Sequence, residues 1–240
     1  MHFVLVDTAD ARGCVGLFRD RQLLTVDPHP AEADFSSWLL PAVHRLLSQN
    51  ALSLSNLDGY AVCSGPGSFT GLRVGLTTLK AWAEICQKPI VAVSRLESLA
   101  AAAPVAPTRA VPYTAAFLDA RRSQVFAALY NQQGIAVEPE SVIDLENFLL
   151  LAESVCGNAA ILWRTPDARL LEDLPQWPLR QANGDTLERV QPPFAAELGA
   201  LAHRKFLSGQ TTDPISLDAN YVRRSDAELL WKDQSSAVKA

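Results

Sequence analysis

Residues 64–76, SGPGSFTGLRVGL, are the stretch whose residue types and spacing are best suited to chemistry. Glycines and a proline lie among small hydroxyl residues, directly before a helical pattern. Free backbone N–H groups at such a helix start can hold a phosphate. However, the stretch lacks the Gly-Lys-Ser/Thr ending of a P-loop, and Gly65, Gly67 and Gly71 do not form the dinucleotide-binding pattern. The stretch therefore predicts a tight turn into a helix, and it leaves anion binding open.

Two aspartates occupy matching places in the two halves of the chain. Asp7 ends an apolar strand near the N-terminus, and Asp119 ends a similar strand that begins near Thr114. Each is followed by a tight turn and a returning apolar strand. Carboxylates at such places can hold magnesium beside a phosphate, and they can also simply cap a turn. Asp7 and Asp119 are thus candidate residual phosphate or magnesium positions, with a structural role as the alternative.

Composition narrows the class of protein. The net charge is −5, from 21 basic and 26 acidic residues, so we do not expect the chain to hold nucleic acid by itself. The four cysteines form no CxxC pair and the four histidines are scattered, which argues against a disulfide framework and against a metal site. No segment is long enough to span a membrane and no basic leader precedes the first strand, which favours the cytoplasm.

The pattern of elements predicts an α/β protein with two lobes. Each half opens with a hairpin and continues with alternating strands and helices, as in a mixed sheet covered by helices. The Pro-rich stretch 103–112 suggests the boundary, which gives a first lobe of 1–103 and a smaller second lobe of 104–240. This arrangement suggests the actin-like fold of actin, sugar kinases and heat-shock chaperones (ASKHA). The second lobe is poor in nucleotide motifs, because its only candidate loop, CGNAA, offers a single glycine.

Helices predicted over residues 31–50 and 68–87 carry more apolar surface than one core-facing stripe requires. In the second helix, a further small or apolar set that includes Val74, Thr78 and Trp82 lies beside the core stripe. Burial inside a layered lobe explains this extra surface, and so does contact with another protein. The periodicity alone favours burial.

Several motifs resemble one known family, TsaB/YeaZ. GPGSFTGLR at Gly65–Arg73 is similar to its signature, and LLPAVHRLL at Leu39–Leu47 is similar to its first helix. DARRSQVFAALY at Asp119–Tyr130 resembles its second-lobe hairpin, and NYVRR near the end resembles its C-terminal segment. The resemblance covers nearly the whole chain. Ala9 stands where a serine is usual in the family.

The resemblance implies a scaffold subunit in the synthesis of threonylcarbamoyladenosine on tRNA. Members pair through their first two helices, with themselves or with a catalytic, TsaD-like paralogue that carries an HxxxH metal site absent from this sequence. A TsaE-like ATPase is a further implied partner, and tRNA is reached only through the complex. The chain is then expected to be no enzyme and to have no cofactor of its own, with ATP or ADP at the junction between subunits left open. The family's old glycoprotease label is disfavoured, because the separated histidines offer no metal ligands.

This hypothesis assigns roles to individual residues. The expected partner contacts are Trp38, Leu39, Val43, Leu46, Arg73, Val74, Thr77, Thr78 and Trp82. The motif loop consists of Gly65, Pro66, Gly67, Ser68, Phe69, Thr70 and Gly71. In this loop the glycines and the proline shape the turn, Ser68 or Thr70 caps the helix, and Phe69 and Leu72 anchor it in the core. The alternative is a free-standing ATP-binding phosphotransferase or ATPase that uses Asp7 and Asp119.

Overall fold

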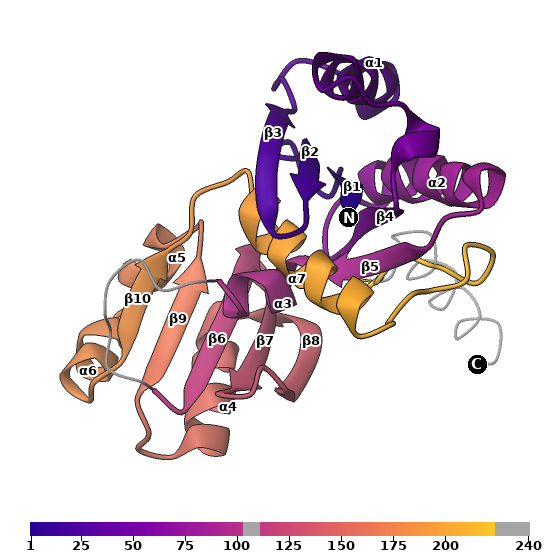
Figure 1. Ribbon diagram of the computed structural model, residues 1–240. Helices are drawn as coiled ribbons and strands as arrows, with labels where there is room; N and C mark the ends of the chain where they lie inside the picture. Colours follow the sequence, from indigo (N-terminus) through magenta and orange to yellow (C-terminus); the bar gives the residue numbers. More distant parts are fainter. Residues whose placement is uncertain (103–110, 224–240) are drawn as a thin grey trace, which may run out of the picture.

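The computed structural model describes residues 1–102 and 111–223, and it has two lobes, each built on a five-stranded mixed sheet (Figure 1). In spatial order the first sheet contains β3 (Gln22–Pro28), β2 (Cys14–Arg19), β1 (His2–Asp7), β4 (Gly59–Gly65) and β5 (Ile90–Ser94). The first three strands are antiparallel, whereas β4 and β5 run parallel to β1. The second sheet contains β8 (Ala136–Asp144), β7 (Gln124–Asn131), β6 (Tyr113–Asp119), β9 (Ile161–Thr165) and β10 (Thr186–Arg189).

The second sheet repeats the strand order and directions of the first. β6 pairs antiparallel with β7 and parallel with β9, as β1 does with β2 and β4. Asp7 and Asp119 are the last residues of β1 and β6, so their predicted equivalence is confirmed. The predicted two-lobed α/β fold is confirmed with it.

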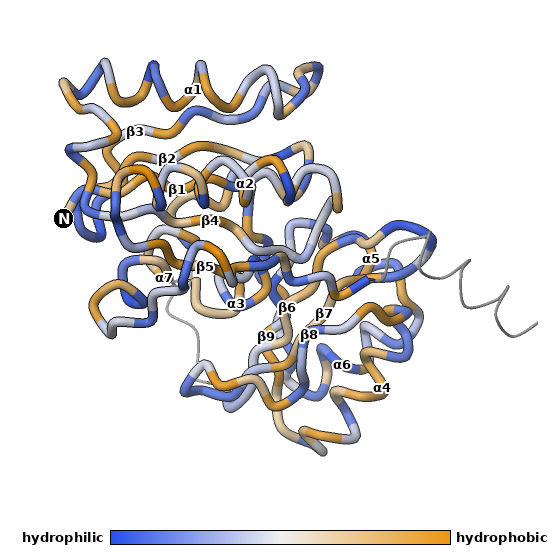
Figure 2. Tube along the Cα trace, turned by 90° about the vertical axis from the view of Figure 1, so that its right-hand side faces the viewer, coloured by the Kyte–Doolittle hydropathy of each residue, from blue (hydrophilic) through white to orange (hydrophobic). Residues whose placement is uncertain are grey.

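Helices cover both faces of the first sheet, which explains why its central strands are apolar on both sides. α1 (Phe35–Gln49) and α2 (Phe69–Cys86) lie on one face, and α3 (Arg95–Ala100) and α7 (Ala195–Leu207) lie on the other (Figures 1 and 2). A short turn of 3-10 helix, Leu54–Asn56, precedes β4. α1 begins later than predicted, because Asp34 is its N-cap residue.

The second lobe has its own core, on the face of its sheet away from α3. α4 (Leu145–Cys156) packs against β7 and β8, while α5 (Arg169–Glu172) and α6 (Trp177–Ala182) are short. Trp163 lies at the centre of this core, and its ring meets those of Phe117, Phe148 and Trp177 at steep angles. Among the described helices, none combines the length and apolar character needed to cross a bilayer.

The position of α7 does not follow the predicted division of the chain into two lobes between residues 103 and 104. That division put everything after 103 into the second lobe, but Leu198 and Leu201 of α7 are buried in the core of the first. The following segment stays there, since Thr212 pairs with Ile90 and the Asn220 N–H donates to the Ser64 carbonyl at 2.7 Å. The apolar face of α7 fits the uncovered face of the first sheet. Most of the predicted boundary stretch 103–112 lies outside the described part of the chain, which leaves out residues 103–110.

Candidate functional site

The glycine loop after β4 brings the start of α2 into direct contact with the chain after β1. The Ser68 N–H donates to the Ala9 carbonyl at 2.6 Å. A Cβ atom at Gly67 would run into that same carbonyl, and one at Gly71 would run into the carbonyl of Thr8. The glycines are therefore needed for close packing of two backbones. At least one N–H group that could have held a phosphate is already bonded within the protein.

Two of the predicted roles in this loop can be compared with the structure. Ser68 is the N-cap of α2, because its Oγ accepts a hydrogen bond from the Gly71 N–H at 3.3 Å, and Leu72 is buried in the core. Phe69, however, is 39% exposed and is not the core anchor that the sequence suggested. It lies on the surface between Arg73, whose guanidinium is 3.8 Å from its ring centre, and Tyr221. The first turn of α2 turns Phe69 outward and Leu72 inward.

Asp7 is fully buried and cannot reach a ligand from its position. One of its oxygens accepts a hydrogen bond from the Ala9 N–H at 2.9 Å, and the other lies 3.5 Å from Nε of buried Arg95. Burial raises the pKa of Asp7, and Arg95 opposes this shift. Burial alone would lower the pKa of Arg95, but the charges of Asp7 and Asp10 outweigh this effect and raise it. The predicted ligand position at Asp7 is thus part of a buried ion pair.

A chain of ion pairs connects this buried pair to the second lobe. Asp10 accepts from Arg95 at 2.9 Å and from Arg12 at 3.0 Å. Arg12 also donates to Asp167, at 3.0 Å, and the other oxygen of Asp167 accepts from the Asp119 N–H. Although burial opposes it, Arg95 and Arg12 lower the pKa of Asp10 to about 2. Asp10 is therefore ionised at neutral pH and forms part of the link between the lobes.

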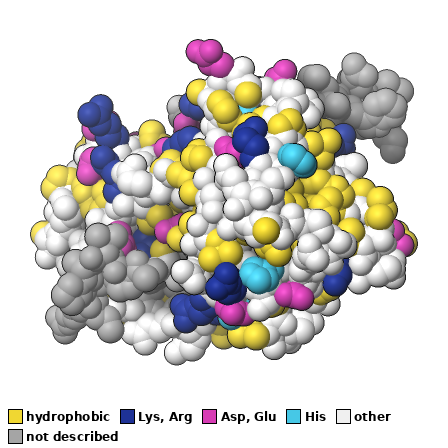
Figure 3. All heavy atoms as spheres, turned by 45° about the horizontal axis from the view of Figure 1, so that its top comes forward, with side chains coloured by type: hydrophobic (Ala, Val, Ile, Leu, Met, Phe, Trp, Pro, Cys, Tyr) yellow, Lys and Arg dark blue, Asp and Glu magenta, His cyan; other side chains and the backbone are white. Residues whose placement is uncertain are grey.

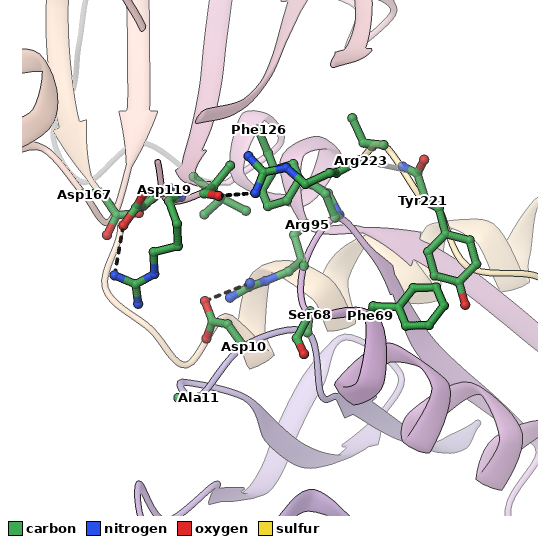
Figure 4. Close-up of a pocket in the computed structure, with 18 of the residues that line it drawn as sticks. Asp10, Ala11, Ser68, Phe69, Arg95, Asp119, Phe126, Asp167, Tyr221 and Arg223 are labelled. Carbon is green, nitrogen blue, oxygen red and sulfur yellow. Dashed lines mark hydrogen bonds and ion pairs between the residues drawn. The ribbon is translucent and has the colours of Figure 1, made fainter. Parts of the chain in front are cut away.

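These residues line a cleft of about 800 Å³ between the lobes (Figure 4). The first lobe contributes residues 9–12 after β1, Pro66–Phe69 at the start of α2, and Arg95. The second contributes the tight turn after β6 with Asp119, together with Asp167, and the segment Asn220–Arg223 closes one side. Asp119 thus lies at the cleft, as predicted, whereas Asp7 lies beneath it.

The residues present do not fit a magnesium–nucleotide complex of the kind that ATP-using members of this fold class bind. Magnesium needs several open oxygen ligands in a strict geometry. Here Asp7 is covered, and the carboxylates of Asp10, Asp119 and Asp167 all face guanidinium groups. Across the described residues, no three or more Cys, His, Asp or Glu side chains gather as a metal site would require.

The predicted partner contacts divide between the two helices. Trp38, Leu39, Val43 and Leu46 are buried in the core of the first lobe, so the prediction that they face a partner is wrong. α1 contacts β2, β3 and α2 together, and this wide contact buries these four side chains.

The predicted contacts on α2 do reach the surface. Arg73 and Thr77 are exposed, while Val74, Thr78 and Trp82 are half-buried. We call these five residues the α2 face. Two exposed apolar side chains of the same helix pair extend the apolar surface, Leu40 at 55% exposure and Ile85 at 78%. In Figure 3, which brings α1 and α2 toward the viewer, hydrophobic side chains gather on this side with few charges among them.

The arginines of the cleft were missed from the sequence. Arg12 and Asp167 are 155 positions apart, and nothing local marks them as partners. One signal was present: the triplet Asp-Ala-Arg occurs at residues 10–12 and again at 119–121. In the structure the two triplets line the cleft from opposite lobes.

Two lobes with one repeated strand order, meeting at a cleft beside the glycine loop, define a protein of the actin-like class. The family model described as TsaD, tRNA N6-adenosine threonylcarbamoyltransferase, matches residues 24–160. The chain is 27% identical to the tRNA threonylcarbamoyladenosine biosynthesis protein TsaB of Bacillus subtilis, over 96% of this chain and 98% of that protein. The TsaB of Escherichia coli is 28% identical, over 97% of both chains.

A solved structure shares both the fold and part of the sequence of this chain. YeaZ from Pseudomonas aeruginosa superimposes with a TM-score of 0.69 and 26% identity, covering 92% of this chain and 99% of that one. The chain therefore belongs to the TsaB/YeaZ family, within the wider group that the TsaD model describes.

Proposed function

We propose that this chain is a non-catalytic subunit in the biosynthesis of threonylcarbamoyladenosine on tRNA, and that it acts by docking to a catalytic, TsaD-like paralogue. The observation that carries the proposal is its relation to proteins named TsaB over nearly its full length. The cleft supports the non-catalytic part, because its carboxylates are engaged by arginines and offer no open base or metal ligand. We place this activity in the cytoplasm.

The α2 face is the docking surface that we propose. More than half of this chain matches the model of the transferase itself, so we expect a TsaD-like partner to have equivalent helices in an equivalent place. Two similar helix pairs can then pack as a four-helix contact. A typical interface of this kind buries about 1,600 Å² in total. Thr77 lies on the exposed side of α2 and would be covered in such a contact.

Capture of the paralogue by the purified chain tests this surface. Thr77→Arg places a long charged side chain into the proposed contact, and because Thr77 is exposed the change leaves the fold intact. Half-buried Val74 and Thr78 are poorer test sites, since Thr78 also donates a hydrogen bond to the Val74 carbonyl. We expect Thr77→Arg to weaken binding of a TsaD-like protein by about tenfold or more, because a buried unpaired charge is costly.

The matched control is Thr186→Arg, which makes the same change on the exposed end of β10 in the other lobe. It should leave binding unaltered. Equal binding by wild type and both variants would remove the α2 face from the proposal. Two results together would remove the docking role altogether. The wild-type chain would bind no TsaD-like protein, and tRNA would keep its modification in the absence of the chain.

The remaining partners follow from the same role. A TsaE-like ATPase would join the complex, and tRNA would be bound through the complex, since this chain is acidic overall. Alone, the chain would form a homodimer through the α2 face, in competition with the paralogue. Light scattering with and without the paralogue tests this competition. If the homodimer persisted in the complex, the homodimer contact and the paralogue contact would lie on different surfaces.

A further inference from the structure

Two motifs that lie far apart in the sequence meet at the start of α2. GPGSFTGLR supplies Phe69 and Arg73, and NYVRR supplies Tyr221, which comes 148 positions after Arg73. The rings of Phe69 and Tyr221 lie side by side, with their centres 5.0 Å apart (Figure 4). We call these three residues the arginine clamp. The docking surface described above includes Arg73 but gives no part to the two rings.

The arginine clamp orients Arg73 although this residue is exposed. The guanidinium lies 3.8 Å from the centre of the Phe69 ring, and its Nε donates to the Tyr221 hydroxyl at 3.1 Å. An exposed arginine normally samples many rotamers, and ordering it on binding costs free energy. The two contacts reduce that cost before a partner arrives. They also give a reason for the exposure of Phe69, which packs on the arginine instead of in the core.

The charge of Arg73 has no counter-ion among the residues that the structure describes. Within these residues Arg73 forms no ion pair, and its only side-chain hydrogen bond is the one to Tyr221. Its terminal nitrogens, Nη1 and Nη2, are therefore left for an acceptor on another molecule. Lys80, further along α2, differs, because its ammonium group donates to the carbonyls of Ile215 and Leu217. Arg73 is also the only charged residue of the α2 face.

The surroundings of Arg73 fit a protein partner better than RNA. A nucleic acid is held by several cations spread over a surface. The rest of the α2 face and exposed Ile85 are instead small or apolar, and the chain is acidic overall. An arginine and aromatic rings beside apolar surface are typical of the residues that contribute most to protein–protein binding. On a protein, the group that matches a guanidinium is a carboxylate, which accepts from both terminal nitrogens.

Contacts on both sides fix the chain directly before Tyr221. The Asn220 N–H donates to the Ser64 carbonyl at 2.7 Å, and the Asn220 side chain donates to Glu140 of β8. Glu140 also accepts from Ser94 of the first lobe. The position of the arginine clamp therefore depends on both lobes as well as on α2.

We propose that the arginine clamp binds a carboxylate of the docked TsaD-like paralogue and that this contact helps to select the paralogue. Arg73 makes the contact, and Phe69 and Tyr221 are positioning residues. The inference rests on the proposed docking role, and it extends the docking surface from α2 to the C-terminal segment. Covering Arg73 without a counter-charge is costly, so a protein that lacks a carboxylate at this place is disfavoured as a partner.

Calorimetry of the full chain with the purified TsaD-like paralogue, at low and at high salt, tests the contact. Arg73→Gln removes the charge at an exposed position, so the fold stays intact. We expect it to weaken binding by about tenfold at low salt and by less at high salt, because salt screens the charge pair. Arg73→Lys keeps the charge but loses the planar group, and its effect should be intermediate. Arg189→Gln, which changes an exposed arginine of the other lobe, is the matched control and should bind as wild type does.

Tyr221→Phe tests the positioning. It keeps the ring beside Phe69 but removes the acceptor of the Arg73 Nε. We expect a smaller loss of binding, about threefold, because one hydrogen bond that orients the guanidinium is lost. In a chain that already carries Arg73→Gln, the same change should have no further effect, since Tyr221 acts through Arg73. Additive losses would show that Tyr221 acts independently, and they would overturn the arginine clamp.

Three further results would overturn the inference. Arg73→Gln would bind the paralogue as wild type does, or its binding would be weakened equally at every salt concentration, or it would lose binding to tRNA while keeping the paralogue. Comparison with Thr77→Arg separates this inference from the docking role. If Thr77→Arg weakened capture and Arg73→Gln did not, the docking role would stand without the arginine clamp. If the wild-type chain captured no paralogue, both would be overturned.

Discussion

Gly71 shows how one small residue positions a whole helix. It lies in the first turn of α2, against the backbone of Thr8 after β1. The contact brings α2 close enough for Leu72 and Leu76 to fill the core beneath it. A Cβ atom at Gly75, one turn further on, would likewise run into the Thr8 side chain. The repeated glycines of the motif are thus explained by packing against the end of β1.

Gly71→Ala should therefore destabilise the protein. The added Cβ would collide with the Thr8 carbonyl, and relief of this overlap requires α2 to move away from β1. We expect a loss of roughly 2–3 kcal/mol in the free energy of unfolding, measured with urea.

Gly134→Ala is the control for that measurement. A Cβ at Gly134 has open space around it, and only its positive φ of 74° opposes the change. A cost of about 1 kcal/mol is expected there. If Gly71→Ala cost no more than Gly134→Ala, close packing would not explain the motif.

At the scale of elements, the sequence predicted what depends on local pattern. The β1–β2 and β6–β7 hairpins and helix α2 were found from alternation, turn residues and helical spacing. The side on which an element packs was harder to predict. Trp38 and Leu39 were assigned to a partner, yet the wide contact of α1 with β2, β3 and α2 buries both. The cleft arginines were missed because their partners are distant in the chain, as for Arg12 and Asp167.

The helix α3 is stabilised by contacts with its surroundings. Six residues are too few for a stable isolated helix. Its N-terminal end is held by Ser94, whose Oγ accepts from the Glu97 N–H, and by the ion pairs of Arg95. At the other end, Arg164 from β9 donates to the carbonyls of Ala100 and Ala102, at 2.8 and 2.6 Å. α3 is thereby fixed between the two sheets.

Arg164→Met should destabilise the protein by about 2–4 kcal/mol in urea unfolding, because it removes the donor from these part-buried carbonyls and the ion-pair partner from Glu188. Arg189→Met on the neighbouring strand β10 is the matched control. Arg189 is exposed and its ion pair with Glu172 is long, at 3.5 Å, so its loss should cost less than about 0.5 kcal/mol. Equal effects of the two changes would show that α3 does not depend on Arg164.

At the scale of the whole molecule, contacts on both sides of the cleft hold the lobes together. On one side Arg12 reaches Asp167. On the other, Glu140 of β8 accepts hydrogen bonds from Ser94 of the first lobe and from Asn220. Burial raises the pKa of Glu140, and these donors oppose that shift. Together with α3, which packs between the two sheets, these contacts fix the position of one lobe relative to the other.

Acid should weaken this junction through Asp10. The pKa of Asp10 is about 2 in the folded protein, below its ordinary value of 3.8. A lowered carboxyl pKa contributes stability that is complete above the ordinary value and is lost as the pH falls through the folded value. The difference corresponds to roughly 2.5 kcal/mol. Asp10→Asn removes this contribution, so the unfolding free energies of wild type and variant should differ most near neutral pH and converge between about pH 4 and pH 2. A difference that stays constant over that range would show that the charge of Asp10 does not stabilise the junction.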